Sequence, residues 1–249
     1  MLKNLKIFQS KEVPSFIWFS LPIIIFFSIF TFKHFNYDFF YFFFKNETGF
    51  IENGTFIILF FSIITSIFIL KTIKKKGFNK KIYFCILFFL FGLIYFAGEE
   101  ISWGQQWFKW ETFSFFKELN NQSETNFHNI NSWFDQKPKF LLLCFVFVGG
   151  IFIPILFRNK KINNQSIKYW IYPTICCLPA SLLCLFFYLL DNLYKSICRG
   201  TPGIDISCDY IPGLLLLRTS EIIEFYIAFF LFIYVLSIYL RLKANRILK

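Results

Sequence analysis

Six long apolar runs separated by polar segments make up most of the chain. A helix needs about 20 apolar residues to cross the ~30 Å hydrocarbon core of a bilayer, and each run approaches that length when its interfacial ends are included. The pattern therefore predicts an all-α membrane protein with six transmembrane helices in one domain. The predicted spans are residues 16–32, 55–70, 82–104, 140–157, 169–190 and 214–240 of the single domain 1–249.

The polar segment between the third and fourth spans, residues 105–139, is unusual because aromatic side chains are spread along it. Aromatic side chains favour the headgroup region of a membrane, which accommodates both their apolar rings and their polar atoms. We therefore expect this segment to lie along the membrane interface. Its aromatic residues include Trp107, Phe108, Trp110, Phe113, Phe115, Phe116 and Trp133.

Glycine and proline interrupt two of the predicted spans. Gly149-Gly150 and Pro154 lie in the fourth span, and Pro173 and Pro179 lie in the fifth. Membrane helices tolerate these residues where neighbouring groups bind the freed backbone, so they predict kinks. Close packing of helices at small residues explains them equally well.

The positions of the basic residues indicate how the spans are oriented. The N-terminal segment, the loops 71–81 and 158–168 and the C-terminal tail are rich in lysine and arginine, whereas the other three loops hold most of the acidic residues. Cytoplasmic loops of membrane proteins carry an excess of lysine and arginine. We therefore expect both termini in the cytoplasm.

Composition supports the same class of protein. The chain is 56% hydrophobic, contains 41 phenylalanines and is only 16% charged, which is too apolar for a soluble domain of 249 residues. The net charge of +11 lies in the loops between spans, so membrane orientation explains it and nucleic-acid binding is not expected. Of the seven cysteines, Cys198 and Cys208 share one outer loop, where they either form a disulfide or remain free thiols.

Two adjacent carboxylates, Glu99 and Glu100, follow the third apolar run. An acidic residue near the centre of a membrane costs about 2.5 to 3.5 kcal/mol, so it marks a functional site unless its side chain reaches the aqueous interface. The predicted orientation places six further polar residues at the same outer level of the membrane. They are Glu47, Glu52, Glu124, His128, Glu221 and Glu224.

The spacing of residues after Glu99 predicts a shared helical face. If the third span stays helical, Glu99, Ser102 and Gln106 lie at positions i, i+3 and i+7, and Glu100 is turned by about 100° from them. One carboxylate of the pair can then face the helix bundle while the other faces solvent or a neighbouring helix.

Two further pairs have helical spacing. Glu124 and His128 are four residues apart, which can place a carboxylate and an imidazole on the same ion. Glu221 and Glu224 are three residues apart and share a face. Arg218 lies one turn before Glu221, and an ordinary intrahelical ion pair between these two residues is the alternative interpretation.

The stretch Gly98-Glu99-Glu100-Ile101-Ser102-Trp103-Gly104-Gln105, followed by residues 120–129, resembles a group of uncharacterised bacterial multi-pass membrane proteins. That group shares a Glu-Glu-x-Ser-Trp-Gly-Gln block, an Asn-x-Gln-x-Glu-x-Asn-x-His-Asn block and late glutamate pairs. The resemblance covers most of the chain, implies the bacterial cytoplasmic (inner) membrane and assigns no activity. This sequence departs from the group at Gln106, where a basic residue is common, so no shared role for Gln106 is implied.

A weaker resemblance involves the alkaline ceramidase superfamily. Glu99-x-x-Ser102 is similar to the first motif of that family. The zinc site of the family requires three histidines, and this chain has only His34 and His128. The comparison therefore supports only the general idea of an acid-rich hydrolase within the membrane.

The first functional hypothesis is an enzyme that acts on a lipid or lipid-linked substrate at the outer leaflet, with a metal-dependent or an acid/base mechanism. Carboxylate ligands favour Mg²⁺, Mn²⁺ or iron over thiolate-selected metals. The candidate catalytic residues are Glu99, Glu100, Ser102, Gln106, Glu124 and His128. The candidate metal ligands are Glu99, Glu100, Glu124, His128, Glu221 and Glu224.

Two alternatives come from other classes of function. A proton-coupled transporter would use the same acids, but the predicted cytoplasmic halves of the spans carry few polar side chains, whereas alternating access requires a polar path through the membrane. A membrane scaffold would instead use the aromatic outer segment to bind a protein partner. Membrane lipids are expected neighbours in all three cases.

Overall fold

The computed structural model describes residues 4–5, 12–45, 49–77, 79–112, 114, 125–126, 132–163, 166–198 and 219–244. Within these residues, six helical stretches are long and apolar enough to cross a membrane, which confirms the predicted number of spans. They are Phe16–Phe35, Phe50–Lys75, Lys80–Glu100, Lys137–Leu156, Ile167–Ser196 and Ser220–Ala244. The fold class is that of a helical multi-pass membrane protein.

Three of the six spans are assembled from shorter pieces that follow one another along the chain. The first combines η2 and α1, the fourth combines α7, η5 and α8, and the fifth combines α9, η6 and α10. The elements in chain order are β1 (Asn4–Leu5), η2 (Phe16–Ser20), α1 (Leu21–Phe35), α2 (Tyr37–Phe40), η3 (Tyr41–Lys45), α3 (Phe50–Lys76), α4 (Lys80–Glu100), η4 (Ser102–Gly104), α5 (Gln105–Phe108), α7 (Ser132–Cys144), η5 (Phe145–Phe152), α8 (Ile153–Leu156), β2 (Ile162–Asn163), α9 (Ile167–Ile171), η6 (Ile175–Cys177), α10 (Leu178–Cys198) and α11 (Ser220–Ala244).

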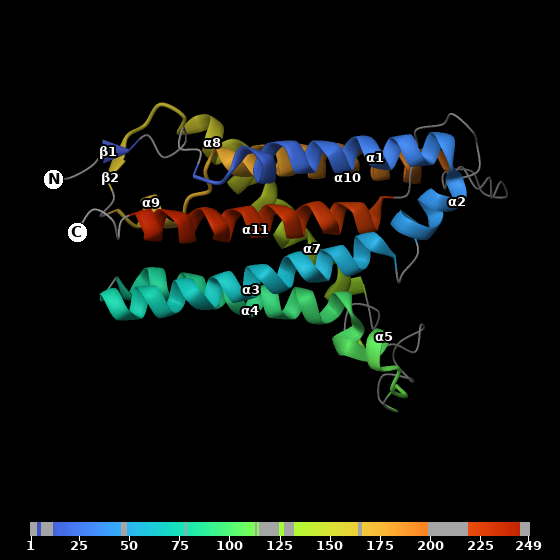
Figure 1. Ribbon diagram of the computed structural model, residues 1–249, viewed down its shortest axis with the longest axis horizontal. Helices are drawn as coiled ribbons and strands as arrows, with labels where there is room; N and C mark the ends of the chain where they lie inside the picture. Colours follow the sequence, from blue (N-terminus) through green and yellow to red (C-terminus); the bar gives the residue numbers. More distant parts are fainter. Residues whose placement is uncertain are drawn as a thin grey trace.

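The sixth span, α11, lies at the centre of the bundle. Figure 1 shows it between α1 and α10 on one side and α3 and α4 on the other, and it packs directly against α3 and α10. In its most apolar window, 78% of the residues are buried, compared with 11–44% in the other spans. The other spans therefore face lipid on one side and α11 or its neighbours on the other.

Helices α3 and α4 form an antiparallel hairpin with a short connection. Gly77 ends α3 in the left-handed conformation (φ 63°), which glycine adopts without steric cost. Asn79 then starts α4, because its side chain accepts a hydrogen bond from the backbone N–H of Lys81 (2.8 Å). The two helix ends are thus fixed by local sequence.

The glycines of the fourth span are points of close packing. A Cβ atom built on Gly150 would lie 1.8 Å from Ser181 Oγ of α10 and 2.8 Å from a ring carbon of Phe230 of α11. Gly150 therefore allows η5, α10 and α11 to approach one another. At Gly150, close packing of helices at a small residue is therefore confirmed.

The fifth span is broken near Pro173, as the kink interpretation predicted. Helix α9 ends at Ile171, and η6 begins at Ile175. The backbone carbonyls freed at this break are bound by α11: Tyr234 donates from its hydroxyl to Ile171 O (2.7 Å), and Arg241 donates to Tyr169 O and Tyr172 O. An interrupted membrane helix is stable only where such partners are present.

A two-residue antiparallel strand pair is the one piece of β structure in the described residues. Strand β1 pairs with β2, with Asn4 opposite Asn163 and Leu5 opposite Ile162. The pair lies at the same end of the bundle as the C-terminal end of α11 (Figure 1).

Several predicted boundaries shift. The third span ends at Glu100 and not at residue 104, because the chain leaves the helix at Ile101. Helix α7 begins at Ser132, inside the segment predicted to lie along the interface, and the fourth candidate span begins at Lys137 and not at residue 140. Helix α11 begins at Ser220, and the predicted start at Leu214 lies outside the described residues.

Candidate functional site

The end of α4 is a tight turn. Ser102, Trp103 and Gly104 follow one another with positive φ angles of 46°, 56° and 101°. These angles end the helix, and the indole of Trp103 lies on Gly98, where a Cβ atom would be only 2.9 Å from three ring carbons. Gly98 is therefore required for the close approach of Trp103, and the block from Gly98 to Gln105 is first of all a helix-ending structure.

This turn fixes the carboxylate of Glu99. Trp103 Nε1 donates a hydrogen bond to Glu99 Oε1 (2.8 Å), and the Glu99 residue is only 6% exposed. A buried carboxylate needs hydrogen-bond donors because it has lost its water. The indole supplies one of them.

The predicted common face of Glu99, Ser102 and Gln106 is wrong, because it required the helix to continue past Glu100. In the turn, Ser102 Oγ accepts a hydrogen bond from Asn126 Nδ2 (3.2 Å). Gln106 Nε2 instead donates to Glu52 Oε1 of α3 (2.8 Å). Both residues take part in contacts between α3, the turn and the polar segment that follows it.

The two sequence blocks meet at this turn. The backbone N–H of Thr125 donates to Gln105 Oε1, and Gln105 Nε2 donates to Thr112 Oγ1 (2.7 Å). Thr125 and Asn126 are buried against this turn. Glu124 and His128 lie outside the described residues, so their assignment to the site stays a prediction.

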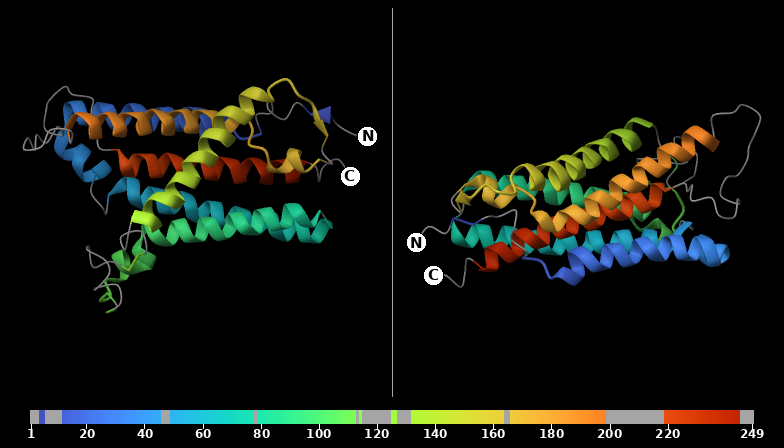
Figure 2. Two further views of the ribbon diagram at one scale, coloured as in Figure 1. Left: turned by 180° about the vertical axis from the view of Figure 1, so that it is seen from behind. Right: turned by 90° about the horizontal axis from the view of Figure 1, so that it is seen from above.

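A cavity of about 300 Å³ lies between α4, α7 and α11. Figure 2 shows α7 beginning near the end of α4 and running obliquely across the bundle. The lining combines four charged side chains with a larger set of apolar and aromatic ones. The lining residues are Phe88, Gly92, Tyr95, Phe96, Glu99, Glu100, Pro138, Lys139, Leu141, Leu142, Glu224 and Ile227.

The cavity opens toward the side of the bundle. Phe88 and Leu141 both line it, and they are 83% and 68% exposed. Both residues belong to membrane spans, so their exposed surfaces face the region that lipid occupies. A molecule dissolved in the bilayer could therefore enter without crossing the aqueous phase.

The charged end of the cavity contains an ion pair. Lys139 Nζ lies 2.5 Å from Glu224 Oε1, and the two side chains are 27% and 22% exposed. Glu100 is half-buried beside them, and the charges of Glu224, Glu221, Glu52 and Lys139 all act on it. The predicted convergence of acids from several spans is therefore present for Glu100 and Glu224.

Glu221 has a different environment from Glu224. It accepts a hydrogen bond from the hydroxyl of the neighbouring Ser220 (2.9 Å) and is not among the residues that line the cavity. Arg218, its predicted intrahelical partner, lies outside the described residues, as does Glu47.

Sequence reasoning missed two charged residues. One is Lys139, which directly precedes the predicted fourth span, and a lysine at the predicted outer end of a span is a signal because it is contrary to the usual distribution. Asp191 was also missed. Its carboxylate is 2.5 Å from Lys195 Nζ and accepts a hydrogen bond from the backbone N–H of Thr219 (3.2 Å), which ties the end of α10 to the start of α11.

The predicted metal ligands are not assembled into a binding shell by the residues described. No group of three or more His, Cys, Asp or Glu side chains in this part of the chain is arranged to hold a metal ion. Four predicted ligands therefore lie near one another at the same end of the bundle without forming a ligand set. They are Glu99, Glu100, Glu221 and Glu224. Cys208 also lies outside the described residues, so a disulfide with Cys198 stays a prediction.

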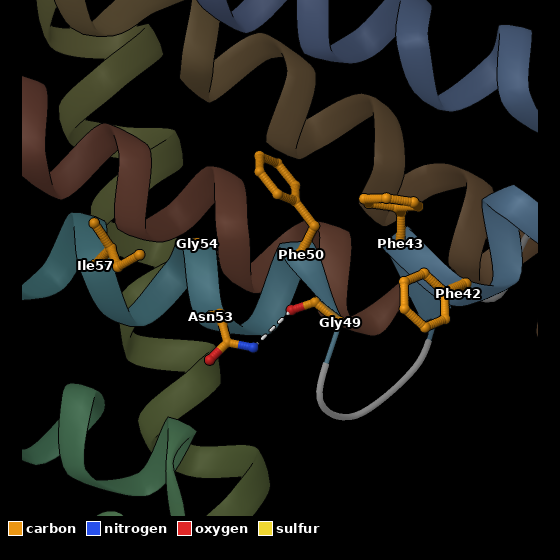
Figure 3. Close-up of a pocket in the computed structure, with 7 residues that line it drawn as sticks. All are labelled: Phe42, Phe43, Gly49, Phe50, Asn53, Gly54 and Ile57. Atoms are coloured by element: carbon orange, nitrogen blue, oxygen red, sulfur yellow. Dashed lines mark hydrogen bonds between the residues drawn. The ribbon is translucent and has the colours of Figure 1, made fainter. Parts of the chain in front are cut away.

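A second cavity of about 280 Å³ lies between η3 and the start of α3 (Figure 3). Phe42, Phe43 and Phe50 form much of its lining. The one hydrogen bond drawn there runs from Asn53 Nδ2 to Gly49 O (3.0 Å), within the helix end itself. No charged side chain lines this cavity, so the cavity between α4, α7 and α11 is the better candidate for chemistry.

Comparisons with protein-family models, with curated proteins and with solved structures find no match to this chain. The resemblance to the bacterial membrane protein group stays a prediction. The geometry of the cavity is therefore the basis for any functional assignment.

Proposed function

We propose that this protein is a membrane-embedded enzyme that acts by acid/base chemistry on a lipid or lipid-linked substrate at the outer leaflet. The observation that supports this proposal is the cavity between α4, α7 and α11, which has carboxylates and an ammonium group at one end and apolar walls along the rest. An amphiphile has the same division between a polar head and an apolar tail.

The lateral opening supports a substrate from the bilayer. Phe88 and Leu141 lie at the lipid-facing side, and Leu142 and Ile227 extend the apolar wall toward the bundle. Burial of hydrocarbon against such side chains contributes about 25 cal/mol per Å² where water is displaced. A lipid tail already lies in hydrocarbon, so the charged end must provide most of the selectivity.

Glu100 is the candidate acid or base. It lines the cavity close to the Lys139–Glu224 ion pair, whereas Glu99 is held by the Trp103 indole. A carboxylate in a low-dielectric site can take up and release a proton during a reaction, and positioned acid/base groups contribute about 10²- to 10⁴-fold to a rate. Glu99 then positions the helix end, and Glu100 transfers the proton.

The proposal predicts that Glu100→Gln abolishes turnover. The protein is reconstituted in liposomes made from the lipids of the host cell, and lipid species are compared by mass spectrometry before and after incubation. We expect a head-group change with the unsubstituted protein and a rate at least about a hundredfold lower with Glu100→Gln, because the amide cannot exchange the proton.

Glu111→Gln serves as the matched control, because Glu111 is exposed in the outer segment and does not line the cavity. We expect this variant to retain the rate of the unsubstituted protein. If neither that protein nor the control changes any lipid, the enzyme proposal is wrong, even if lipid is bound.

A metal-dependent form of the mechanism would need Glu124 or His128 to approach the cavity, since the described acids do not form a ligand set by themselves. Elemental analysis of the purified protein tests it. A stoichiometric divalent ion that is lost in Glu100→Gln would favour this form over acid/base chemistry alone.

Transport is the second candidate, and one observation favours it. A buried polar cluster lies at the opposite end of α11, where Arg241 (3% exposed) lies 3.5 Å from Glu12 and Ser237 contacts both Glu12 and Thr174. The predicted cytoplasmic halves of the spans were expected to carry few polar side chains, and this cluster is an exception. Between Glu224 and Ser237, however, α11 presents about 20 Å of helix whose only polar side-chain atoms are the hydroxyls of two tyrosines. This apolar stretch does not favour a continuous polar path.

A further inference from the structure

The charged side chains around the cavity do not balance one another. Three carboxylates, Glu99, Glu100 and Glu224, line it together with one ammonium group, Lys139. Lys139 is paired with Glu224, and Glu99 accepts a hydrogen bond from Trp103. Among the described residues no hydrogen bond satisfies the carboxylate of Glu100. Glu100 is therefore the group that can still bind a donor from a ligand.

We propose that the cavity binds a phospholipid whose head group carries a primary amine, with the ammonium group beside Glu100 and the phosphate beside Lys139. This inference rests on the function proposed above and specifies the class of substrate. The acyl chains would lie against Phe88, Leu142 and Ile227. The ammonium group of the lipid then lies beside a carboxyl group of the cavity, and its phosphate lies beside an ammonium group of the cavity.

Anionic head groups without an amine fit the same cavity poorly. Their phosphate would approach Lys139, while the rest of the head group brings no cation to a cavity lined by three carboxylates and one ammonium group, and like charges in a low-dielectric site repel strongly. A primary ammonium group, in contrast, offers three donors, and charge-assisted hydrogen bonds are about twice as strong as neutral ones.

Quaternary ammonium head groups are the closest competitors. Tyr95 and Phe96 also line the cavity, and aromatic rings attract quaternary ammonium ions. Such an ion has no N–H group, so it cannot donate a hydrogen bond to Glu100. The structure therefore assigns the preference to the primary amine.

The test measures which lipids stay bound. The protein is reconstituted in an equimolar mixture of phosphatidylethanolamine, phosphatidylcholine and phosphatidylglycerol and extracted in mild detergent, and retained lipids are counted by native mass spectrometry. We expect about tenfold enrichment of phosphatidylethanolamine over phosphatidylglycerol, the factor that corresponds to one charge-assisted hydrogen bond. Glu100→Gln should reduce the enrichment to the ratio in the mixture.

Two variants control for folding and for general charge effects. Glu100→Asp keeps the charge and should retain a preference for the amine lipid. Lys137→Gln removes an exposed lysine two residues from Lys139 that does not line the cavity, and it should behave as the unsubstituted protein does. Lys139→Gln should weaken retention of all three phospholipids, because each has a phosphate.

The outcomes separate this inference from the proposed function. Equal retention of the three lipids, removed when Leu142→Trp fills the cavity, would overturn the head-group assignment and leave lipid binding in the cavity intact. Retention that Leu142→Trp leaves unchanged would show that the lipid lies elsewhere, and both proposals would then be wrong.

Discussion

At the scale of single residues, the C-terminal end of α4 depends on one close contact. The Trp103 indole lies on Gly98 and donates to Glu99, so a small residue, an aromatic residue and a buried acid form one unit within six positions. The unit determines where the helix ends and hence which of the two adjacent carboxylates borders the bundle and which is held by the turn.

Gly98→Ala should destabilise the protein. The new methyl group would lie 2.9 Å from three carbons of the indole, so Trp103 must move and its hydrogen bond to Glu99 is weakened. Overpacking of this kind costs about 1–3 kcal/mol, and thermal unfolding in detergent measures it. Gly92→Ala is the matched control on the same helix, because its Cβ would meet no atom within 4 Å. Equal melting temperatures for the two variants would contradict the contact.

The sequence could identify Glu99 and Glu100 but not distinguish their roles. Their cost in an apolar run is visible from composition alone. Both line the cavity, but which of them accepts the Trp103 hydrogen bond depends on three successive positive φ angles, and two of those belong to Ser102 and Trp103, residues that rarely adopt them. Lys139 joins Glu100 only through the packing of α7 against α4 and α11, which no local pattern contains.

At the scale of elements, the break in the fifth span is stabilised by hydrogen bonds from the central helix α11. Arg241 of α11 binds two carbonyls freed near Pro173 and lies beside Glu12, so one side chain connects α9, α11 and the segment before the first span. The break itself was predictable from proline. Its partner was not, because the sequence presents Arg241 as one of several cations at the end of the last apolar run.

Arg241→Met should be strongly destabilising, since it leaves both the carbonyls and the part-buried Glu12 carboxylate without their cation. Removal of one partner of a buried ion pair costs about 3–5 kcal/mol. Denaturation in detergent measures the loss, and Lys243→Met, which removes an exposed cation two residues later, should have little effect. The double variant Glu12→Gln/Arg241→Met should recover part of the stability. Similar stabilities for Arg241→Met and Lys243→Met would show that the cluster is not important for folding.

At the scale of the whole molecule, polar groups gather at the two ends of α11 and are separated by an apolar middle. The N-terminal end of α11 holds the Lys139–Glu224 pair beside the cavity, and the C-terminal end holds Glu12 and Arg241. The positive-inside distribution predicts that the second end faces the cytoplasm. The number of spans followed directly from hydropathy, whereas the central position of α11 did not, because all six runs are similarly apolar.

Labelling with a membrane-impermeant maleimide tests this orientation. Lys75→Cys lies at the end of α3 and should react only after the cells are permeabilised, whereas Glu111→Cys should react in intact cells. Labelling of the unsubstituted protein gives the background from its own cysteines. The reverse labelling pattern would show that the predicted orientation is wrong and that the cavity lies at the inner leaflet.

The central position of α11 also has a consequence for how the protein is made. Of the six spans, α11 is the last to leave the ribosome, yet it is the one that the others surround. Insertion of separate helices precedes their association in a membrane. The five earlier spans are therefore inserted in the bilayer before their common partner is present. Their final arrangement, together with the cavity, can form only after α11 has been synthesised up to Ala244.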